Sequence, residues 1–196
     1  MKNIDPKNPK AENRDRFVLS KGHCAPGLYS ALALKGFFPF EDLKTLRHIG
    51  SYLQGHPNMN TVPGIDMSTG SLGQGISAAA GMAKGAKYLD KDINVYTLLG
   101  DGEIEEGQVW EAMMFASQYK LDNLCVIVDV NGLQIDGKCE DVMNAEPIDK
   151  KMEAFGLNVI KINGNDFDEL EKAFNAFHEN IGSGKPFGII MKTVKG

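Results

Sequence analysis

Residues 95–137 read VYTLLGDGEIEEGQVWEAMMFASQYKLDNLCVIVDVNGLQIDG, and this stretch decides the fold. The apolar runs 95–99 and 124–128 are typical of buried strands, and apolar residues at helical spacing predict a helix over 108–119. Parallel strands joined by a helix cross over right-handed, so both strands end at the same edge of the sheet. The stretch therefore predicts an α/β fold with a ligand site at that edge.

The rest of the chain extends this unit into a mostly parallel sheet flanked by helices. Short apolar runs predict further strands at 17–19, 158–162 and 187–191. Helical patterns are expected at 28–34, 41–48, 147–155, from the glycine cluster near 70 to about 89, and after Asp166. Residues 1–13 are rich in charge and proline, so we expect a polar surface lead-in without a core contribution, followed by one domain over 14–196.

The helix after Asp166 carries two local signals. Asp166 followed by Glu169 resembles a capping box, in which each residue satisfies a backbone N–H of the other. One apolar face of this helix is expected to carry Phe167, Leu170, Phe174 and Phe177.

Composition excludes several classes of function. The net charge is −5 and no basic stripe is present, which argues against a nucleic-acid partner. No apolar stretch is long enough for a membrane span, and the polar N-terminus favours a cytoplasmic location. The three cysteines are scattered, which fits reduced thiols and neither a disulfide framework nor a zinc site.

Asp101 and Asn131 follow the two central strands and are candidate metal ligands. Both offer oxygen, which hard cations such as Mg²⁺ prefer, and phosphate oxygens often complete such a shell. Gly102 removes a side chain where a phosphate would approach the backbone, and the amides after it lead into a helix. The alternative is structural: an Asp-Gly turn and an Asx turn with no ligand.

The glycine cluster Gly70-Ser71-Leu72-Gly73-Gln74-Gly75 has three interpretations. A dinucleotide fingerprint must follow a strand directly, whereas this cluster follows a loop, so that interpretation is disfavoured. The cluster could instead present backbone N–H and C=O groups to a flat ring. Its small residues could also serve only close helix packing.

Polar residues elsewhere leave further alternatives open. His23 and His56 lie in irregular segments rich in Gly and Pro, where they either line a pocket or are structural. A thiol nucleophile formed by Cys24 with His23 is disfavoured, because adjacent side chains diverge. Four glutamates lie around the start of the central helix: Glu103, Glu105, Glu106 and Glu111. Either the helix dipole stabilises their negative charges, or one of them holds a proton at an interface with a partner.

Several motifs together resemble those of transketolases. GDGEIEEGQVWEA with LDNLCVIVDVNGLQIDG resembles the thiamine diphosphate motif of that family, and RDRFVLSKGH, GHP and STGSLGQGIS occur in the family order. KPFGIIMKTVKG resembles the end of the same module. The resemblance spans 14–196 and is closest to the N-terminal, diphosphate-binding subunit of split transketolases. Deoxyxylulose phosphate synthase is a relative whose motifs fit less well.

The resemblance implies a metal and diphosphate site. Asp101, the Asn131 side chain and the Leu133 carbonyl would bind Mg²⁺ or Ca²⁺. The Gly102 amide and His23 would contact the diphosphate of thiamine diphosphate.

The resemblance also implies contacts to the rest of the cofactor and to substrate. Gly70 and Leu72 would face the aminopyrimidine with backbone groups, and Ile135 would pack against the cofactor rings. His56 would reach the substrate. Glu106 would join a glutamate network across a dimer interface.

The family comparison further implies that this chain holds half of a site. Relatives carry an earlier helix with a Gly-His-Pro motif and a further histidine beyond the Lys-Gly end, so we expect truncation at both ends. The pyrimidine module, which supplies the activating glutamate, is expected on a separate C-terminal subunit. The assembly would be a homodimer or heterotetramer that transfers a two-carbon ketol unit between sugar phosphates, as in the pentose phosphate pathway. The alternative is a non-catalytic remnant that binds the cofactor.

Overall fold

A five-stranded parallel sheet forms the centre of the molecule, with strand order β1-β2-β3-β7-β6. The computed structural model describes residues 1–135 and 137–195; Asp136, within the NGLQIDG motif, and Gly196, the predicted end of the domain, lie outside the described residues. The strands of this sheet are β1 (Arg16–Leu19), β2 (Val95–Gly100), β3 (Leu124–Val130), β6 (Asn158–Asn163) and β7 (Phe187–Lys192). The predicted parallel strands are therefore confirmed.

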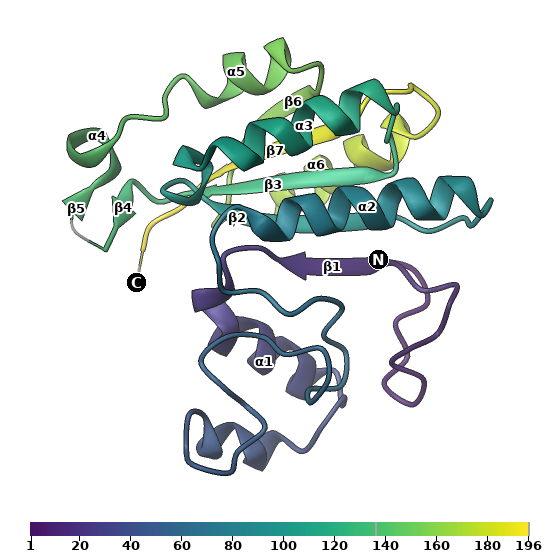
Figure 1. The fold of residues 1–196 in the computed structure, drawn as a ribbon, viewed down its shortest axis with the longest axis vertical. Coiled ribbons are helices and arrows are strands. Elements are labelled where there is room, and N and C mark those ends of the chain that lie inside the picture. The colour runs from purple at the N-terminus through teal and green to yellow at the C-terminus, as the bar shows by residue number, and fades with distance from the viewer. Residues whose placement is uncertain (136, 196) are drawn as a thin grey trace.

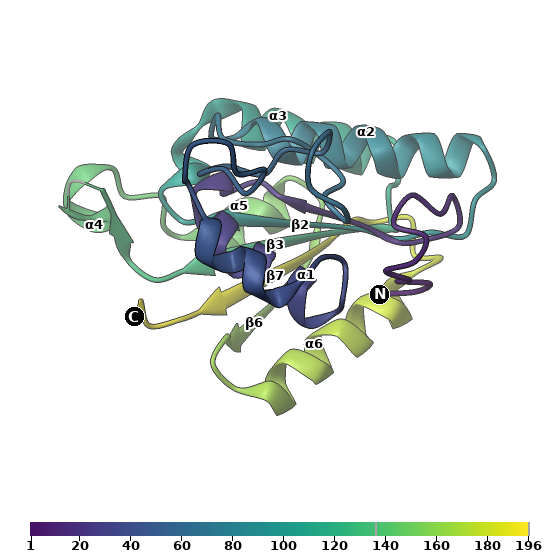
Figure 2. The ribbon, with the colours of Figure 1, turned by 90° about the horizontal axis from the view of Figure 1, so that it is seen from below.

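Helices cover both faces of the sheet (Figure 2). One face carries α2 (Gln74–Tyr88), α3 (Gly107–Gln118) and α5 (Ile148–Ala154), and the other carries α6 (Phe167–Asn180). The small residues of α2 let it pack closely on the sheet, since Ala79, Ala80 and Ala83 are all buried. The expected α/β fold with a mostly parallel sheet flanked by helices is confirmed.

A separate apolar cluster forms beyond β1, around α1 (Ala25–Leu34) (Figure 1). The long loop 46–73 packs over this helix through Leu53, Val62 and Ile65. Asp66 ties the loop to β1, because its Oδ2 accepts hydrogen bonds from Arg14 Nη1 at 2.9 Å and from the Phe17 N–H at 2.8 Å. The irregular segment that carries His56 is thus an ordered part of the fold.

The helix predicted at 41–48 is wrong in type and length. The structure has a 3-10 helix, η2 (Phe40–Thr45), instead of an α-helix. Pro39 precedes it in an extended conformation, Leu46 is extended, and Arg47 has a φ of 63°. The extended Leu46, followed by the positive φ of Arg47, ends the helix after Thr45.

The expectation that residues 1–13 contribute nothing to the core is also wrong. Ile4 is half-buried and packs against the cluster around α1. The Lys2 N–H donates a 2.6 Å hydrogen bond to Oδ2 of the buried Asp15, which holds the segment against the sheet. Although the segment is rich in charge, the side chain of Ile4 packs against apolar residues of the fold.

The start of α6 differs from prediction in two details. Asp166 is the N-cap and accepts hydrogen bonds from the N–H groups of Asp168 and Glu169. Glu169 Oε2 accepts from the Asn163 N–H at 2.7 Å, so the reciprocal half of a capping box is not made. Phe167 is 87% exposed, because the first helical residue lies beyond the apolar face that Phe177 buries.

Short elements not expected from sequence lie near the carboxyl edge of the strands. The hairpin of β4 (Leu133–Gln134) and β5 (Gly137–Lys138) follows β3, and α4 (Cys139–Val142) comes directly after it. The 3-10 turns η1 (Gly22–Cys24) and η3 (Glu103–Glu105) follow β1 and β2. No helix in the described part of the chain has the length and hydropathy that a bilayer span needs.

Candidate functional site

The predicted site at the ends of β2 and β3 is brought together by the sheet register. Gly100 pairs with Asp129 across these strands, and the Asp101 N–H donates to the Asp129 carbonyl at 3.1 Å. Asp101 Oδ2 then accepts a 2.6 Å hydrogen bond from the Gly132 N–H. Asp101 therefore contacts the segment that carries Asn131, as the crossover argument predicts.

Asp101 keeps the capacity to bind a cation. Its side chain is buried, and Oδ1 accepts from the Gly102 N–H at 3.0 Å while Oδ2 accepts from Gly132. A carboxylate offers about four acceptor positions, so each oxygen retains one after these two bonds. The donor set of Asp101, the Asn131 amide and the Leu133 carbonyl therefore fits an oxygen-liganded cation.

The Asx turn that the sequence left as an alternative is present. Asn131 Oδ1 accepts a 3.0 Å hydrogen bond from the Leu133 N–H. This bond leaves a second lone pair on the amide oxygen, so the turn and a ligand role are compatible. Among residues 1–135 and 137–195, no group of three or more His, Cys, Asp and Glu side chains is arranged for a metal.

Gly102 lies against a side chain that the sequence did not point to. A Cβ atom there would lie 2.7 Å from Oε1 of Gln134 and 3.1 Å from its Cβ. The space is thus taken by the Gln134 side chain, which reaches over from the β4–β5 hairpin. The Gly102 N–H itself donates to Asp101 in this structure.

A second group of predicted residues gathers beside the end of β1. A Cβ on Gly22 would lie 2.8 Å from the Gly70 nitrogen, and one on Gly70 would lie 3.1 Å from Cγ of His56. Gly22, Gly70 and the His56 ring are therefore in close contact. His23 is exposed at the surface, but the surrounding chain partly desolvates its ring. This desolvation, followed by the charges of Lys21 and His56, lowers the pKa of His23. The two predicted histidines thus share one region, as the pocket interpretation requires.

The loop that carries His56 is held by the helix beneath it. The Tyr29 side chain is completely buried among apolar neighbours, and its hydroxyl lies 3.0 Å from the carbonyl oxygen of Gln54 and 2.9 Å from that of His56. Burial raises the pKa of Tyr29, which keeps the hydroxyl protonated as a donor. The Gly55-His56-Pro57 turn is therefore fixed before any ligand arrives.

The structure excludes one interpretation of the glycine cluster and supports another. It follows the loop 46–73 and not a strand, which excludes the dinucleotide fingerprint. Gly75 serves close packing, because a Cβ there would lie 2.7 Å from the Ser20 Cα. Leu72 is 37% exposed just before α2, and the contact of its backbone with a flat ring stays a prediction.

The four glutamates separate by environment. Glu103 is buried and accepts hydrogen bonds from the Ser20 hydroxyl, the Gly73 N–H at 2.9 Å and the Gly100 N–H at 3.1 Å. Burial raises the pKa of Glu103, although these donors oppose the shift. Glu106 and Glu111 are exposed, and Glu106 lies against Gly73 at the start of α3. Sequence reasoning did not distinguish Glu103, because its partners are distant in the chain.

A buried ion pair that the sequence did not reveal lies next to the metal candidates. Lys21 Nζ donates to Asp129 Oδ2, and the Thr193 hydroxyl donates to Asp129 Oδ1. Burial acts to lower the pKa of Lys21, but the hydrogen bond and charge of Asp129 outweigh it, so the pKa is raised. This cluster links the ends of β1, β3 and β7, and its partners could not be paired from sequence.

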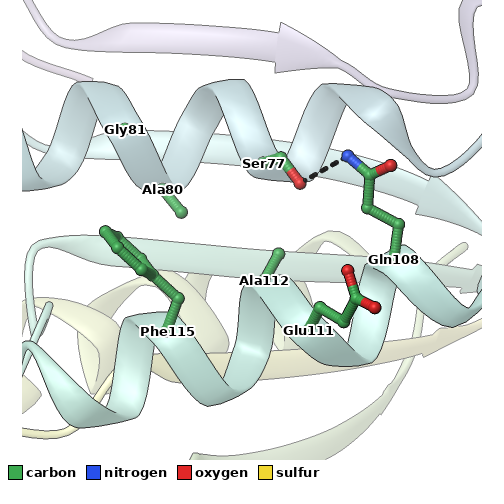
Figure 3. Close-up of a pocket in the computed structure, with 7 residues that line it drawn as sticks. All are labelled: Ser77, Ala80, Gly81, Gln108, Glu111, Ala112 and Phe115. Atoms are coloured by element: carbon green, nitrogen blue, oxygen red, sulfur yellow. Dashed lines mark hydrogen bonds between the residues drawn. The ribbon is translucent and has the colours of Figure 1, made fainter.

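One exposed face of the molecule is formed by α2 and α3. Between these helices lies an open pocket of about 250 Å³, lined by Ser77, Ala80, Gly81, Gln108, Glu111, Ala112 and Phe115 (Figure 3). Gln108 Nε2 donates to the Ser77 hydroxyl at 2.9 Å and so bridges the two helices. Met114 and Phe115 are 52% and 38% exposed on this α2–α3 face. Exposed apolar side chains beside small residues are typical of an interaction surface.

Comparison with known sequences gives a consistent result. Residues 1–196 match the family described as "Transketolase, thiamine diphosphate binding domain". The chain is 48% identical over 193 residues to the 6-deoxy-6-sulfo-D-fructose transketolase subunit SqwG of Clostridium sp. (strain MSTE9), covering 98% of this chain and 70% of that protein. It is 45% identical to one subunit of the apulose-4-phosphate transketolase of Phocaeicola vulgatus, with coverages of 97% and 67%. The Homo sapiens transketolase is 49% identical over 200 residues, and the chain spans 30% of its length.

Solved structures agree with these sequence matches. The fold resembles the transketolase from Leishmania mexicana with a TM-score of 0.89 and 33% identity, covering 96% of this chain and 30% of that one. The transketolase from Campylobacter jejuni gives a TM-score of 0.87 and 40% identity, with the same coverages. The chain therefore spans under a third of these single-chain proteins and about two thirds of the separate subunits.

Proposed function

Because this chain belongs to the transketolase family and forms its thiamine diphosphate-binding domain, we propose that it is the diphosphate- and metal-binding half of a two-subunit transketolase. The complete enzyme would transfer a two-carbon ketol group between sugar phosphates. The observation that supports this most strongly is the meeting of Asp101 and the Asn131 segment at one edge of the sheet, within a chain that matches the family throughout.

The metal would be Mg²⁺ or Ca²⁺, held by Asp101, the Asn131 side chain and the Leu133 carbonyl. The free acceptor positions on Asp101 and the turn at Asn131 support this set. Such a cation would neutralise and orient a diphosphate, which would complete its coordination shell. The buried position of Asp101 favours a single geometry for the ligand.

This chain would hold the diphosphate of thiamine diphosphate and contact part of its rings. His23 and the Gly102 amide would contact the diphosphate, and Gly70 and Leu72 would face the aminopyrimidine. Ile135 is 98% exposed and would bury its side chain against the cofactor rings. The cofactor supplies the nucleophilic carbon for carbon–carbon cleavage and formation, and these residues bind and orient it.

His56 would contact the substrate. Its ring lies against Gly70, and its backbone is held by Tyr29, so the imidazole is positioned without the substrate. An imidazole can donate a hydrogen bond to a sugar hydroxyl or move a proton from it near neutral pH.

The site would be completed by two kinds of protein contact. Relatives that are named as individual subunits of a transketolase imply a second polypeptide, which we propose carries the pyrimidine module. A second copy of this chain would pack on the α2–α3 face, where Glu106 would join a glutamate network. The homodimer of such pairs, a heterotetramer, would act on sugar phosphates in the cytoplasm, in or beside the pentose phosphate pathway.

Reconstitution tests this function. The purified chain, given thiamine diphosphate, Mg²⁺ and a ketose phosphate donor, should show no ketol transfer by itself. Addition of the pyrimidine-module subunit from the same organism should give activity that depends on both proteins and saturates at a fixed ratio. Turnover by the single chain would contradict the half-site assignment, whereas a stable but inactive complex would support a non-catalytic remnant.

A further inference from the structure

We propose that Gln134 and Glu105 form a latch that holds the β4–β5 hairpin on the Asp101-Gly102 turn, so that Gln134 is a positioning residue for the cofactor site. The inference rests on the proposed function for its consequence, because the hairpin carries Leu133, a proposed metal ligand. The latch itself is argued from contacts within this chain.

The first observation is the close approach of Gln134 to the turn. A Cβ on Gly102 would lie 2.7 Å from Gln134 Oε1, 3.1 Å from its Cβ and 3.5 Å from its Cδ. These distances place the Gln134 side chain against the Gly102 Cα, so a larger residue at 102 would displace it. Gln134 is therefore the side chain by which the hairpin rests on the turn after β2.

The second observation is a complementary pair of unsatisfied atoms. Glu105 Oε1 and Gln134 Nε2 are both buried without a hydrogen-bond partner among the described residues. One atom is an acceptor and the other a donor, and a buried polar atom without a partner is costly. The simplest way to satisfy both is a hydrogen bond between them.

The electrostatics place the two groups within reach of one another. Burial and then the negative charge of Asp101 raise the pKa of Glu105, while the Gln134 side chain acts in the opposite direction. A donor that stabilises the charged Glu105 partly offsets the effect of Asp101 on its pKa. Gln134 is thus the neutral donor in a region where acidic groups gather.

The hairpin is held at its base by backbone hydrogen bonds and has few side-chain contacts to the core. The Gly132 N–H donates to Asp101 Oδ2, and the Cys139 N–H donates to the Gly132 carbonyl at 3.0 Å. Each of its strands has two residues, with Leu133 opposite Lys138 and Gln134 opposite Gly137. Leu133 and Ile135 are 42% and 98% exposed, so they do not bury the hairpin against the core. An isolated two-stranded hairpin is marginally stable in water. Gln134 is therefore a side-chain anchor that acts with the backbone bonds of Gly132 to position the neighbouring Leu133 carbonyl and Ile135.

The test compares two single variants with a double variant in which the two residues are swapped. Gln134→Ala and Glu105→Ala each remove the latch, whereas the double variant Glu105→Gln/Gln134→Glu restores a donor and an acceptor with their places reversed. Mg²⁺-dependent binding of thiamine diphosphate is measured by calorimetry in the complex with the pyrimidine-module subunit. Hydrogen–deuterium exchange over 131–135 is measured on the same samples. Lys138→Ala, an exposed change on the same hairpin, is the matched control.

We expect each single variant to weaken cofactor binding by about tenfold, as for other groups that orient metal ligands, and to raise exchange over 131–135. The reciprocal double variant should recover most of both losses, and Lys138→Ala should change neither. A purely structural role would lower stability without this recovery. Should Gln134→Ala fail to fold, Gln134→Asn, which keeps the amide but shortens its reach, carries the same expectations.

Failure of the latch and failure of the proposed function are distinguishable. If the unmodified complex does not bind thiamine diphosphate, the proposed function is wrong, and the exchange data alone then decide whether the latch exists. If the unmodified complex binds the cofactor, but the single variants show unchanged affinity and unchanged exchange, the latch is overturned. The latch is also overturned if the double variant Glu105→Gln/Gln134→Glu does not recover the cofactor affinity that the single variants lose.

Discussion

The Gly132 N–H donates a 2.6 Å hydrogen bond to Asp101 Oδ2, joining two strand ends that lie 31 residues apart in the chain. The same carboxylate accepts from the Gly102 N–H through Oδ1. Asp101 thus fixes the relative position of the turns after β2 and β3 before any ligand is present. A cation at this point would meet a preformed set of oxygens, which lowers the cost of ordering them on binding.

Asp101→Asn should abolish detectable Mg²⁺-dependent binding of thiamine diphosphate in the assembled complex. The amide keeps the size of the side chain but removes the negative charge that a divalent cation requires. Calorimetric titration with the cofactor at saturating Mg²⁺ measures the loss, and circular dichroism checks the fold. Asp141→Asn, an exposed change on α4, is the matched control and should bind normally. Unchanged affinity in Asp101→Asn would refute the metal assignment.

Lys21→Met should destabilise the chain by about 3 kcal/mol, because it leaves the Asp129 carboxylate without its cation in a poorly solvated position. The Lys21 and Asp129 side chains are only 7% and 18% exposed. Urea unfolding measures the change. Lys44→Met breaks an exposed pair with Glu41, whose side chains are 79% and 74% exposed, and serves as the matched control. Its effect should stay within about 1 kcal/mol. Equal effects of the two variants would contradict the role given to the buried pair.

Glu103→Gln should remove a pH dependence of stability. The pKa of Glu103 is raised in the folded state above the ordinary value of 4.5, chiefly by burial, so folding favours the protonated form. Its contribution to the free energy of unfolding is fully present below the unfolded-state pKa of 4.5 and is lost as pH rises through the folded-state pKa.

Urea unfolding at a series of pH values, for both proteins, measures this effect. The native chain should lose stability relative to Glu103→Gln as pH rises from about 4.5, and the difference should then become constant. Glu171→Gln, an exposed change on α6, should run parallel to the native chain. Parallel profiles for Glu103→Gln would show that burial of Glu103 does not shift its titration.

Gly81→Leu should weaken self-association while stabilising the isolated chain. A Cβ at Gly81 would meet nothing within 4 Å, and leucine is favoured over glycine in a helix by about 1 kcal/mol. On the proposed interface, however, the larger side chain would block close approach of a second copy. Sedimentation should show that the dissociation constant of the dimer rises at least tenfold, which corresponds to about 1.4 kcal/mol in the free energy of association.

Gly27→Leu provides the control for that experiment. Gly27 lies in α1, and a Cβ there would also meet nothing within 4 Å. The variant should therefore gain similar helical stability without any change in association. A dimer unaffected by Gly81→Leu would move the interface away from the α2–α3 face.

The elements that carry the site could be predicted from sequence, because their causes are local. The apolar runs that form β2 and β3 and the periodicity of α3 are properties of short segments. The handedness of the crossover then requires Asp101 and Asn131 to meet. The family motifs add the identity of the ligand, which no periodicity contains. These levels agree with each other, as expected of a sequence that specifies one fold.

The errors arose where a local signal competed with backbone geometry or a distant partner. The polar segment 41–48 has helical character, but the extended Leu46 and the positive φ of Arg47 limit it to a short 3-10 helix. Ile4 lies in a charged segment, yet the cluster around α1 offers it an apolar contact. Phe167 has the right spacing for a buried face but lies too early in α6 to reach it.

The sequence by itself determined the strand–helix–strand unit, the parallel sheet and the edge at which polar residues gather, since these follow from short-range patterns and chirality. Only the tertiary structure decided which polar groups pair there. Ser20 and Glu103 are 83 residues apart and Lys21 and Asp129 are 108 apart, and many carboxylates could have taken either place. The tertiary structure determines which carboxylate pairs with each donor. Burial makes an unpaired charge costly, and the register of β1, β2 and β3 leaves one partner within reach.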